Sequence, residues 1–261
     1  MNPVHTAAQR GFSTVAHTYA HNRPDYPAAL LPWLRGQLPA APDMSAMLAV
    51  DLGAGTGKFT RLLTQTGAAV VAVEPVAAMR AQLSERLPEI EVREGSASAI
   101  PLPSGSADLL TCAQAFHWFA TGAALAEIHR VLKPAGRLAL VWNVPDESVD
   151  WVAAVFDILT PYEGDAPRFR NGDWRKAFNG RHFAAPELTT FTHAQVGSVQ
   201  QVIVNRFLST SFIAALPAAE KAVVAQRLHT LAATHPALRG RDSIAFPYRT
   251  EAYCCRRRDT A

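Results

Sequence analysis

The sequence predicts an α/β fold, in which a mainly parallel sheet carries helices on both faces. Short apolar runs alternate between residues 46 and 143 with segments whose apolar residues recur at helical spacing. This alternation is typical of right-handed βαβ units. The runs show little polar alternation, as expected for strands that are buried on both faces. A glycine-rich segment follows the first run directly, at the carboxyl edge where such sheets bind their ligands.

The predicted strands and helices alternate as follows. Val76, Met79 and Leu83 share one helical face between the second and third apolar runs. A later helical stripe includes Leu125 and is expected to stop near Lys133, before a proline and a glycine. The five predicted strands cover residues 46–52, 68–73, 90–93, 107–113 and 137–142.

Beyond Asn143 the pattern changes to longer helices and two further strands. Pro247 lacks the N–H that a sheet ladder needs, so central pairing of the last strand should begin after it. Residues 161–181 read as loops with a short helix. The remaining predicted elements are helices at 152–159, 199–207 and 218–233 and strands at 187–192 and 243–255.

Composition narrows the class of protein. The chain has 261 residues, 49% of them hydrophobic, and a net charge of +3 from 25 basic and 22 acidic residues. A chain with this apolar fraction folds around a core and is not intrinsically disordered. Part of the excess positive charge lies in Arg256–Arg258 near the end, which we expect to be solvated. A nucleic-acid-binding protein would instead carry a basic face or stripe, so no nucleic-acid partner is expected.

Cysteine usage and hydropathy bear on metal binding and location. The three cysteines, Cys112, Cys254 and Cys255, form no C-x-x-C pair, so no metal site is expected. Their number and placement are consistent with a reducing compartment. Residues 1–10 contain no apolar signal core, and no run of 18 apolar residues occurs. We therefore expect a cytoplasmic protein with no membrane partner.

The motif that indicates the cofactor follows the first strand. Residues 51–57 have the pattern D-x-G-x-G-x-G. A P-loop is excluded, because Leu52 occupies the position of its first glycine and Phe59 that of its Ser/Thr. A dinucleotide fingerprint has its third glycine where this chain has Lys58. An NAD(P)-dependent oxidoreductase therefore remains only as an alternative.

S-adenosyl-L-methionine (SAM) fits this pattern better. An acid at the strand end, Asp51, suits a cofactor with an ammonium and a cationic sulfur. Glu74 ends the second strand, 23 residues later, and a carboxylate there can accept hydrogen bonds from both ribose hydroxyls. SAM is therefore the predicted cofactor, with S-adenosyl-L-homocysteine (SAH) as its product.

Residues 51–57, 70–75 and 127–137 resemble motifs of class I SAM-dependent methyltransferases with a methyltransferase type 11 domain. Residues 12–27, 114–119 and 248–253 are similar to the branch that includes trans-aconitate methyltransferase-like enzymes. The resemblance implies a Rossmann-like, seven-stranded, mostly parallel sheet with an antiparallel C-terminal strand and an N-terminal helical lid. It implies a lid segment at 1–45, a SAM-binding core at 46–143 and a substrate-side part with the last strands at 144–261.

The resemblance also implies roles for individual residues. Asp51, Gly53 and Gly55 would line the methionine end of SAM, Glu74 would hold the ribose, and Met79 would lie near the adenine. Ser96 stands where the family often has an aspartate, so the adenine amino group could rely on Ser96 or on the backbone of Ala97. The other expected cofactor-binding residues are Ala54, Gly57, Pro75 and Gln114.

The acceptor side is predicted from the edge of the fourth strand and from the lid. His117 is the best placed titratable group, either as a base or to orient an acceptor. Arg23 could hold a carboxylate bidentately. The other expected substrate-binding residues are Tyr19, Tyr26, Trp118 and Trp142.

These residues predict methyl transfer to an oxygen, of a carboxylate or a hydroxyl, on a small organic acid or secondary metabolite. The segment 114–119 lacks the Asn/Asp-Pro-Pro-Tyr/Phe motif typical of amino-group methylation of DNA. The expected partner is a small molecule, and the protein is expected to be a monomer or homodimer. A SAM-binding protein without turnover is the other alternative.

Overall fold

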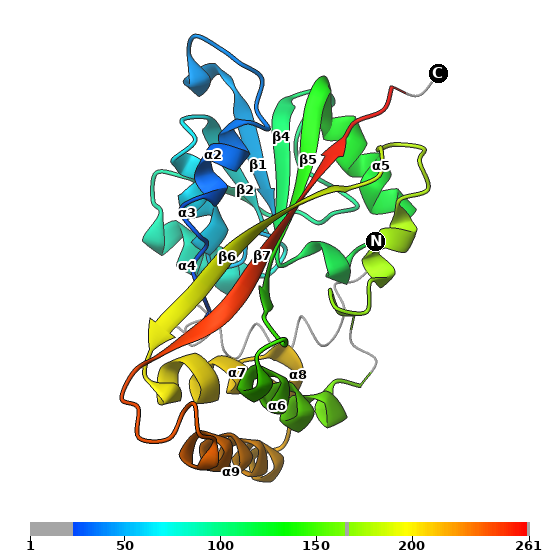
Figure 1. Ribbon diagram of the computed structural model, residues 1–261. Coiled ribbons are helices and arrows are strands. Elements are labelled where there is room, and N and C mark those ends of the chain that lie inside the picture. The colour runs from blue at the N-terminus through cyan, green and yellow to red at the C-terminus, as the bar shows by residue number, and fades with distance from the viewer. Residues whose placement is uncertain (1–22, 165–166, 260–261) are drawn as a thin grey trace.

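The computed structural model describes residues 23–164 and 167–259. Their strands form one seven-stranded sheet in the order β3-β2-β1-β4-β5-β7-β6 (Figure 1). The pairs from β3 to β5 are parallel, and β7 is antiparallel to both β5 and β6. The predicted mostly parallel sheet with an antiparallel C-terminal strand is confirmed. The strands are β1 Leu48–Leu52, β2 Ala69–Val73, β3 Glu91–Arg93, β4 Ala107–Ala113, β5 Leu132–Pro145, β6 Glu187–Gly197 and β7 Ile244–Arg256.

Helices cover both faces of the sheet, as the apolar runs predict. Along β1, Ala49 packs with α2 and α3 on one face, whereas Val50 packs with α5 on the other. Successive side chains of a strand point to opposite faces, so both layers bury apolar residues of the same strands. No helix among the described residues is long and apolar enough to cross a membrane. The α-helices are α2 Leu30–Arg35, α3 Lys58–Thr64, α4 Ala77–Arg86, α5 Gly122–Val131, α6 Asp150–Leu159, α7 Arg206–Leu208, α8 Ser211–Ala214 and α9 Ala218–Thr234.

The C-terminal strands are longer than predicted. β6 runs to Gly197 because it pairs with β7 along its whole length, from Glu187 opposite Cys254 to Gly197 opposite Ile244. Pairing of β7 with β5 begins at Tyr248, directly after Pro247, as predicted. Pairing with the edge strand β6 nevertheless continues through Pro247, and an edge partner tolerates one missing N–H.

Two other boundaries differ from the prediction. β5 begins at Leu132, where α5 ends, and its pairing with β4 shifts register before Arg137. The predicted helix at 199–207 is a π-helix over Gln200–Asn205 that leads into α7. Apolar periodicity cannot distinguish these two helix types over so few residues.

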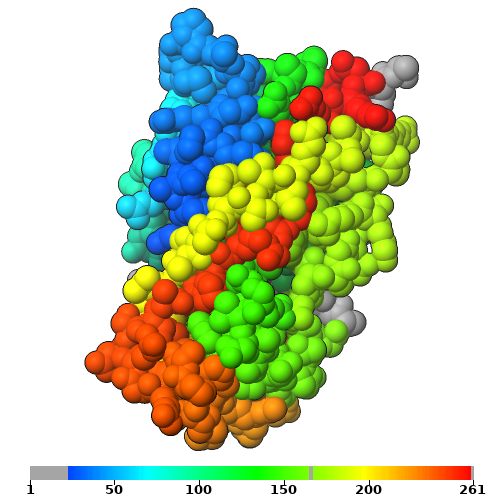
Figure 2. All heavy atoms as spheres, in the orientation of Figure 1, coloured from blue at the N-terminus to red at the C-terminus, as the bar shows by residue number. Residues whose placement is uncertain are grey.

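Beyond β5 lies a second core, built from α6 to α9 and the first half of β7 (Figure 1). Phe246 is fully buried there. Its ring lies edge-on to Trp151 at 5.1 Å and 5.4 Å from Phe207. Figure 2 shows β6 and β7 running across this face of the molecule towards these helices. The same long strands therefore belong to the main sheet and to the helical part.

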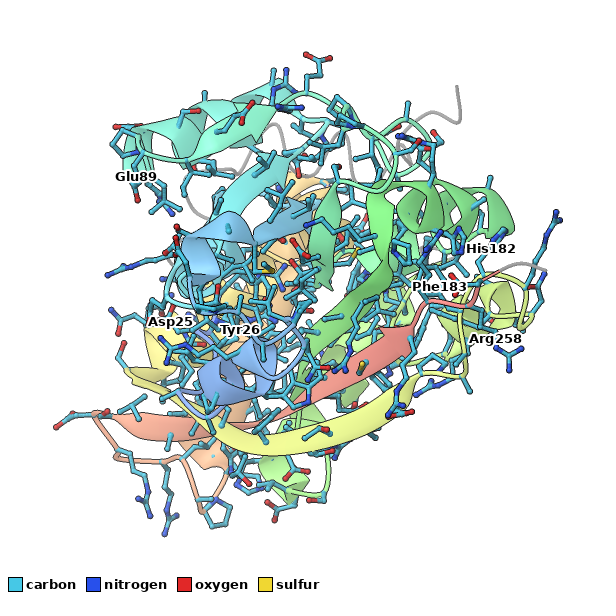
Figure 3. The ribbon with its side chains drawn as sticks, turned by 90° about the horizontal axis from the view of Figure 1, so that it is seen from above. Asp25, Tyr26, Glu89, His182, Phe183 and Arg258 are labelled. Atoms are coloured by element: carbon cyan, nitrogen blue, oxygen red, sulfur yellow. The ribbon has the colours of Figure 1, made fainter. Side chains whose placement is uncertain are left out.

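Arg256 and Arg258 are exposed, as expected for a solvated run, and the three arginines also contact neighbouring residues at the surface. Arg256 pairs with Glu187 at 3.3 Å, and Arg257 pairs with Asp259 at 3.4 Å. The backbone N–H of Arg258 donates to the carbonyl of His182 at 2.9 Å. Figure 3 shows Arg258 beside His182, on the opposite side of the sheet from Asp25 and Tyr26.

The second core yields a stability prediction. Phe246→Ala should lower the free energy of unfolding by about 3–5 kcal/mol, because it leaves a cavity among aromatic rings. Val196→Ala, on the exposed β6 edge at 72% exposure, should change it by less than about 1 kcal/mol. Urea unfolding measures both values. Equal losses in the two variants would contradict the description of this core.

Candidate active site

The glycine loop between β1 and α3 turns through three left-handed residues. Gly53, Gly55 and Gly57 have φ angles of 74°, 57° and 82°. A Cβ on Gly53 would lie 2.8 Å from the Cβ of Ala115, and one on Gly57 would lie 2.9 Å from Leu83 Cγ. A Cβ on Gly55 would meet no atom within 4 Å. Packing therefore explains two of the glycines, whereas Gly55 faces open space that a ligand could fill.

Asp51 lies beneath this loop, fully buried. Its carboxyl oxygens accept hydrogen bonds from Thr60 at 2.7 Å and from Thr111 at 3.3 Å. Burial, only partly offset by these hydroxyls, raises the pKa of Asp51 to about 7. Asp51 is not among the residues that line a cavity. Asp51 joins the end of β1 to α3 and β4 through these hydrogen bonds, and its expected contact with the cofactor stays a prediction.

Glu74 joins the end of β2 to the loop. Its carboxylate accepts one hydrogen bond from the N–H of Gly55 and one from the N–H of Val76, each at 2.9 Å. Burial raises its pKa, and the two backbone donors oppose that shift. Each carboxylate oxygen can accept a further hydrogen bond. Glu74 lines the first cavity together with Gly55. A ligand in this cavity could therefore donate hydrogen bonds to the Glu74 carboxylate.

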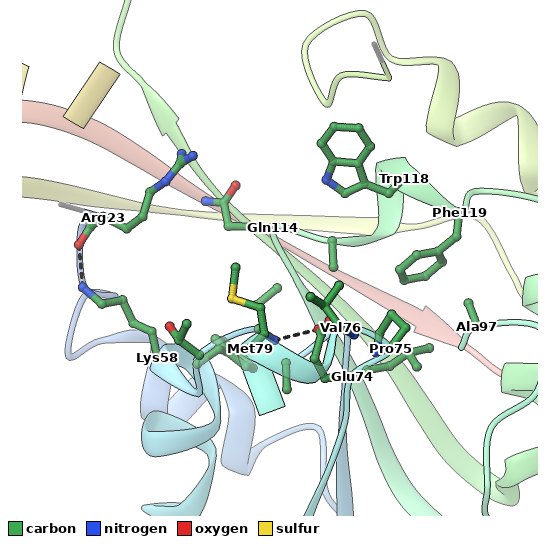
Figure 4. Close-up of a pocket in the computed structure, with 18 of the residues that line it drawn as sticks. Arg23, Lys58, Glu74, Pro75, Val76, Met79, Ala97, Gln114, Trp118 and Phe119 are labelled. Atoms are coloured by element: carbon green, nitrogen blue, oxygen red, sulfur yellow. Dashed lines mark hydrogen bonds between the residues drawn. The ribbon is translucent and has the colours of Figure 1, made fainter. Parts of the chain in front are cut away.

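The first cavity has a volume of about 320 Å³, within the range of small-molecule sites. In Figure 4, Glu74, Pro75 and Met79 lie on one side of it and Trp118 and Phe119 on the other. Gly57, which was expected to bind the cofactor, is outside the lining set, because it packs on α4. The predicted cofactor residues that do line the cavity are Gly53, Ala54, Gly55, Glu74, Pro75, Met79, Ser96, Ala97 and Gln114.

Gln114, at the end of β4, has a strained backbone. Its φ of 57° is the one left-handed value among described residues other than glycine. The strain is held by its N–H, which donates to the Val141 carbonyl at 2.8 Å, and by its side chain, which donates to the Asn143 carbonyl at 3.3 Å. Strained residues of this kind concentrate at functional sites.

A second cavity of about 160 Å³ adjoins the first. It contains His117 and Trp142, two of the predicted substrate-side residues. Gln114 lines both cavities, and so do four further residues: Arg23, Trp118, Asn143 and Arg206. The structure thus places two compartments against one another at the carboxyl edge of the sheet.

His117 is held as a neutral imidazole. Trp142 Nε1 donates to His117 Nδ1 at 3.1 Å, so the imidazole proton resides on Nε2. Burial, together with the positive charges of Arg168 and Arg23, lowers its pKa to about 3. Of the two expected roles, this geometry favours a hydrogen-bond donor that orients an acceptor over a general base.

The segment 23–27 crosses the first cavity. Lys58 Nζ donates to the carbonyl of Arg23 and lies 3.1 Å from the Asp25 carboxylate. Asn143 Nδ2 donates to the carbonyl of Asp25 at 2.9 Å. The ring of Tyr26 stands edge-on to Phe59 at 5.0 Å. Arg23 and Tyr26 both line this cavity, and their expected contact with a substrate stays a prediction.

The rest of the predicted lid gives a mixed result. Leu30 and Leu34 of α2 are fully buried in the core on one face of the sheet, so this part of the segment 1–45 is anchored. Tyr19 and the remainder of residues 1–22 lie outside the described residues. Within the described ranges, no cluster of His, Cys, Asp or Glu could hold a metal ion.

Several lining residues escaped prediction. Arg206 and Arg168 come from segments far along the chain, and nothing local indicates that they reach the cavity. A weak signal exists for Arg206, a charge within the apolar helical stretch from Val202 to Phe207. Asn143 directly follows the predicted fifth strand, which marks the correct edge of the sheet but not its side-chain direction.

The buried carboxyl of Asp51 makes stability depend on pH. Its folded-state pKa of about 7 lies above the ordinary value of 3.8, so the folded protein binds the proton more tightly. The stabilisation from this group is complete below pH 4 and is lost as pH rises through 7.

We expect the unfolding free energy of the wild type, relative to Asp51→Asn, to fall between pH 5 and pH 7 by up to about 1.4 kcal/mol per pH unit. Chemical denaturation at several pH values measures this difference. A constant difference over that range would contradict the burial of this carboxyl.

Sequence comparison identifies relatives over most of the chain. A methyltransferase domain model matches residues 50–140. A methyltransferase-like protein of Schizosaccharomyces pombe is 38% identical over 245 residues, covering 93% of each chain. A methyltransferase of Mycobacterium bovis, named as uncharacterized, is 37% identical over 244 residues, covering 92% of each.

A solved structure from Anaeromyxobacter dehalogenans, proposed to be a type II methyltransferase, is similar in fold. Its TM-score is 0.65 at 24% identity, over 90% of this chain and 96% of that chain. Together with the glycine loop and the sheet order, these matches show that the chain belongs to the methyltransferase family and has the class I methyltransferase fold.

Proposed function

We propose that this methyltransferase uses SAM to methylate an oxygen of a small organic acid or secondary metabolite. The observation that carries the proposal is the meeting of two cavities at Gln114. The first has the features of a nucleoside-binding site, and the second has a hydrogen-bond donor and aromatic walls. A donor and an acceptor bound in the two compartments would face one another at their shared wall.

The residues of the first cavity fit SAM. The open position at Gly55 allows a ligand to approach the backbone closely. Glu74 can accept hydrogen bonds from ribose hydroxyls in addition to its two backbone donors. Ser96 and Ala97 also line this cavity, and we propose that they face the adenine. When bound, SAM supplies an electrophilic methyl group on a cationic sulfur.

Positioning is the main contribution of the protein to this chemistry. Displacement at a sulfonium needs no protonation of the leaving group, so proximity and orientation supply much of the acceleration. A carboxylate acceptor also needs no base, which agrees with the neutral state of His117. We propose that His117 donates Nε2–H to the acceptor. Trp118 and Trp142 form walls that limit the access of water.

A pair of glycine variants tests the cofactor site. Gly55 and Gly105 have similar φ angles, 57° and 63°, and a Cβ on either would meet nothing within 4 Å. Alanine at either position should therefore cost about 1–2 kcal/mol of stability. Gly55→Ala places a methyl group in the cavity and should weaken SAH binding at least about tenfold. Gly105→Ala, outside the cavity, should leave SAH binding unchanged.

Isothermal titration calorimetry with SAH measures both affinities, and thermal unfolding confirms that the two variants are folded. A similar SAH affinity in the Gly55→Ala variant and the wild type would contradict the assignment of the first cavity.

Turnover requires a separate test. The protein is incubated with methyl-labelled SAM and panels of carboxylic acids, phenols, alcohols and amines. Labelled methyl esters or ethers are the expected products. Label found on amines alone would refute an oxygen acceptor. SAH binding without any labelled product would favour the alternative of a SAM-binding protein without turnover.

A further inference from the structure

The second cavity carries an excess of positive charge. Four arginines and two glutamates line it. Both glutamates, Glu147 and Glu163, pair with Arg170 at 3.3 and 3.5 Å. Within the described ranges, neither Arg168 nor Arg206 forms an ion pair. The four guanidinium groups thus outnumber the two carboxylates of this cavity, and Glu163, which pairs with Arg170, is also the carboxylate whose charge acts on Arg168.

Arg206 is the most deeply placed of these groups. It is 7% exposed and follows the π-helix at its C-terminal end. Its Nη1 donates weakly to Thr210 at 3.4 Å, and its guanidinium lies 5.0 Å from the ring of Phe207. Its Nε has no hydrogen-bond partner among the described residues. Burying a cation whose N–H donor lacks an acceptor destabilises the folded protein, unless an anion binds to the group.

Arg168 shows the same pattern on another part of the wall. Its guanidinium stacks over the ring of Phe212 at 4.0 Å. Its Nε and Nη2 are buried, and neither finds an acceptor in the described part of the chain. This contact places the guanidinium over the face of the ring and leaves its N–H donors available. Burial lowers the pKa of Arg168. An anion bound beside the guanidinium would favour its charged form and raise this pKa again.

Aromatic rings form another part of the lining of this cavity. The rings of Trp142 and Phe169 stack at 4.5 Å with an interplanar angle of 29°. Guanidinium groups bind carboxylates through paired N–H donors in one plane. The combination of stacked rings and planar donors suits a planar, unsaturated or aromatic acid.

We infer that Arg168 and Arg206 form a subsite that recognises a carboxylate of the methyl acceptor, and that they determine acceptor specificity. The inference rests on the proposed function, because it assigns the second cavity to the acceptor. It adds that acceptors are anionic acids, that neutral analogues of the same shape are rejected, and that recognition depends on two arginines from the C-terminal part of the chain.

The test compares acids with their amides on the whole protein saturated with SAH. The pairs are benzoate and benzamide, cinnamate and cinnamamide, and fumarate and fumaramide. Ligand-observed NMR titration gives each dissociation constant. At least one acid should bind, at least about tenfold more tightly than its amide. Equal binding within every pair, or no binding of any acid up to about 10 mM, would overturn the inference.

Variants then locate the effect. Arg168→Gln should weaken binding of the acid about tenfold or more and leave binding of the amide unchanged. Arg227→Gln, an exposed position on α9, removes the same charge and should have no effect. A similar loss in both variants would overturn the subsite. SAH calorimetry shows whether each variant is folded, and the acid–amide comparison on the wild type needs no variant.

Two further experiments distinguish a carboxylate from a phosphate ligand, and the subsite from the proposed reaction. Phenyl phosphate binding more tightly than every acid would overturn the choice of a carboxylate. The methyl-transfer assay with labelled SAM distinguishes the two proposals. Charge-dependent binding of an acid without any labelled product would support the subsite and refute the proposed reaction.

Discussion

The hydrogen bond from the Gly55 N–H to the Glu74 carboxylate is the contact on which the site depends. It joins the loop after β1 to the end of β2, so both walls of the first cavity hold a common geometry. The loop can reach Glu74 because three glycines adopt left-handed φ angles. Asp51 supports the same loop from below through Thr60 and Thr111. The cavity therefore depends on backbone geometry more than on the side chains that face it.

Basic residues line both cavities: Arg23 and Arg206 line the two of them, and Lys58 lines the first. Glu74 gives the first cavity an acidic acceptor suited to hydroxyl groups. Four arginines line the second cavity, and burial together with the charges of Arg168 and Arg23 lowers the pKa of His117 to about 3 and keeps it neutral. In the second cavity, an anionic acceptor would meet groups of opposite sign. Such complementarity improves specificity and the rate of encounter as well as affinity.

The sequence was sufficient to predict the parts that depend on neighbouring residues. The apolar runs predicted the strands from β1 to β5, and the spacing of Glu74 from Asp51 placed an acid beside the glycine loop. The direction of the Asp51 side chain was not predictable, because it depends on hydroxyls of α3 and β4. Arg168 and Arg206 were missed for a similar reason: packing across the second core brings distant segments to one wall.

We propose that the first cavity binds SAM and does not bind a dinucleotide. Calorimetric titration of the wild-type protein with SAM and, separately, with NADH tests it most directly. We expect one SAM site per chain and an affinity for NADH at least about a hundredfold weaker, because Lys58 replaces the third glycine of a dinucleotide loop. Tighter binding of NADH than of SAM would contradict it.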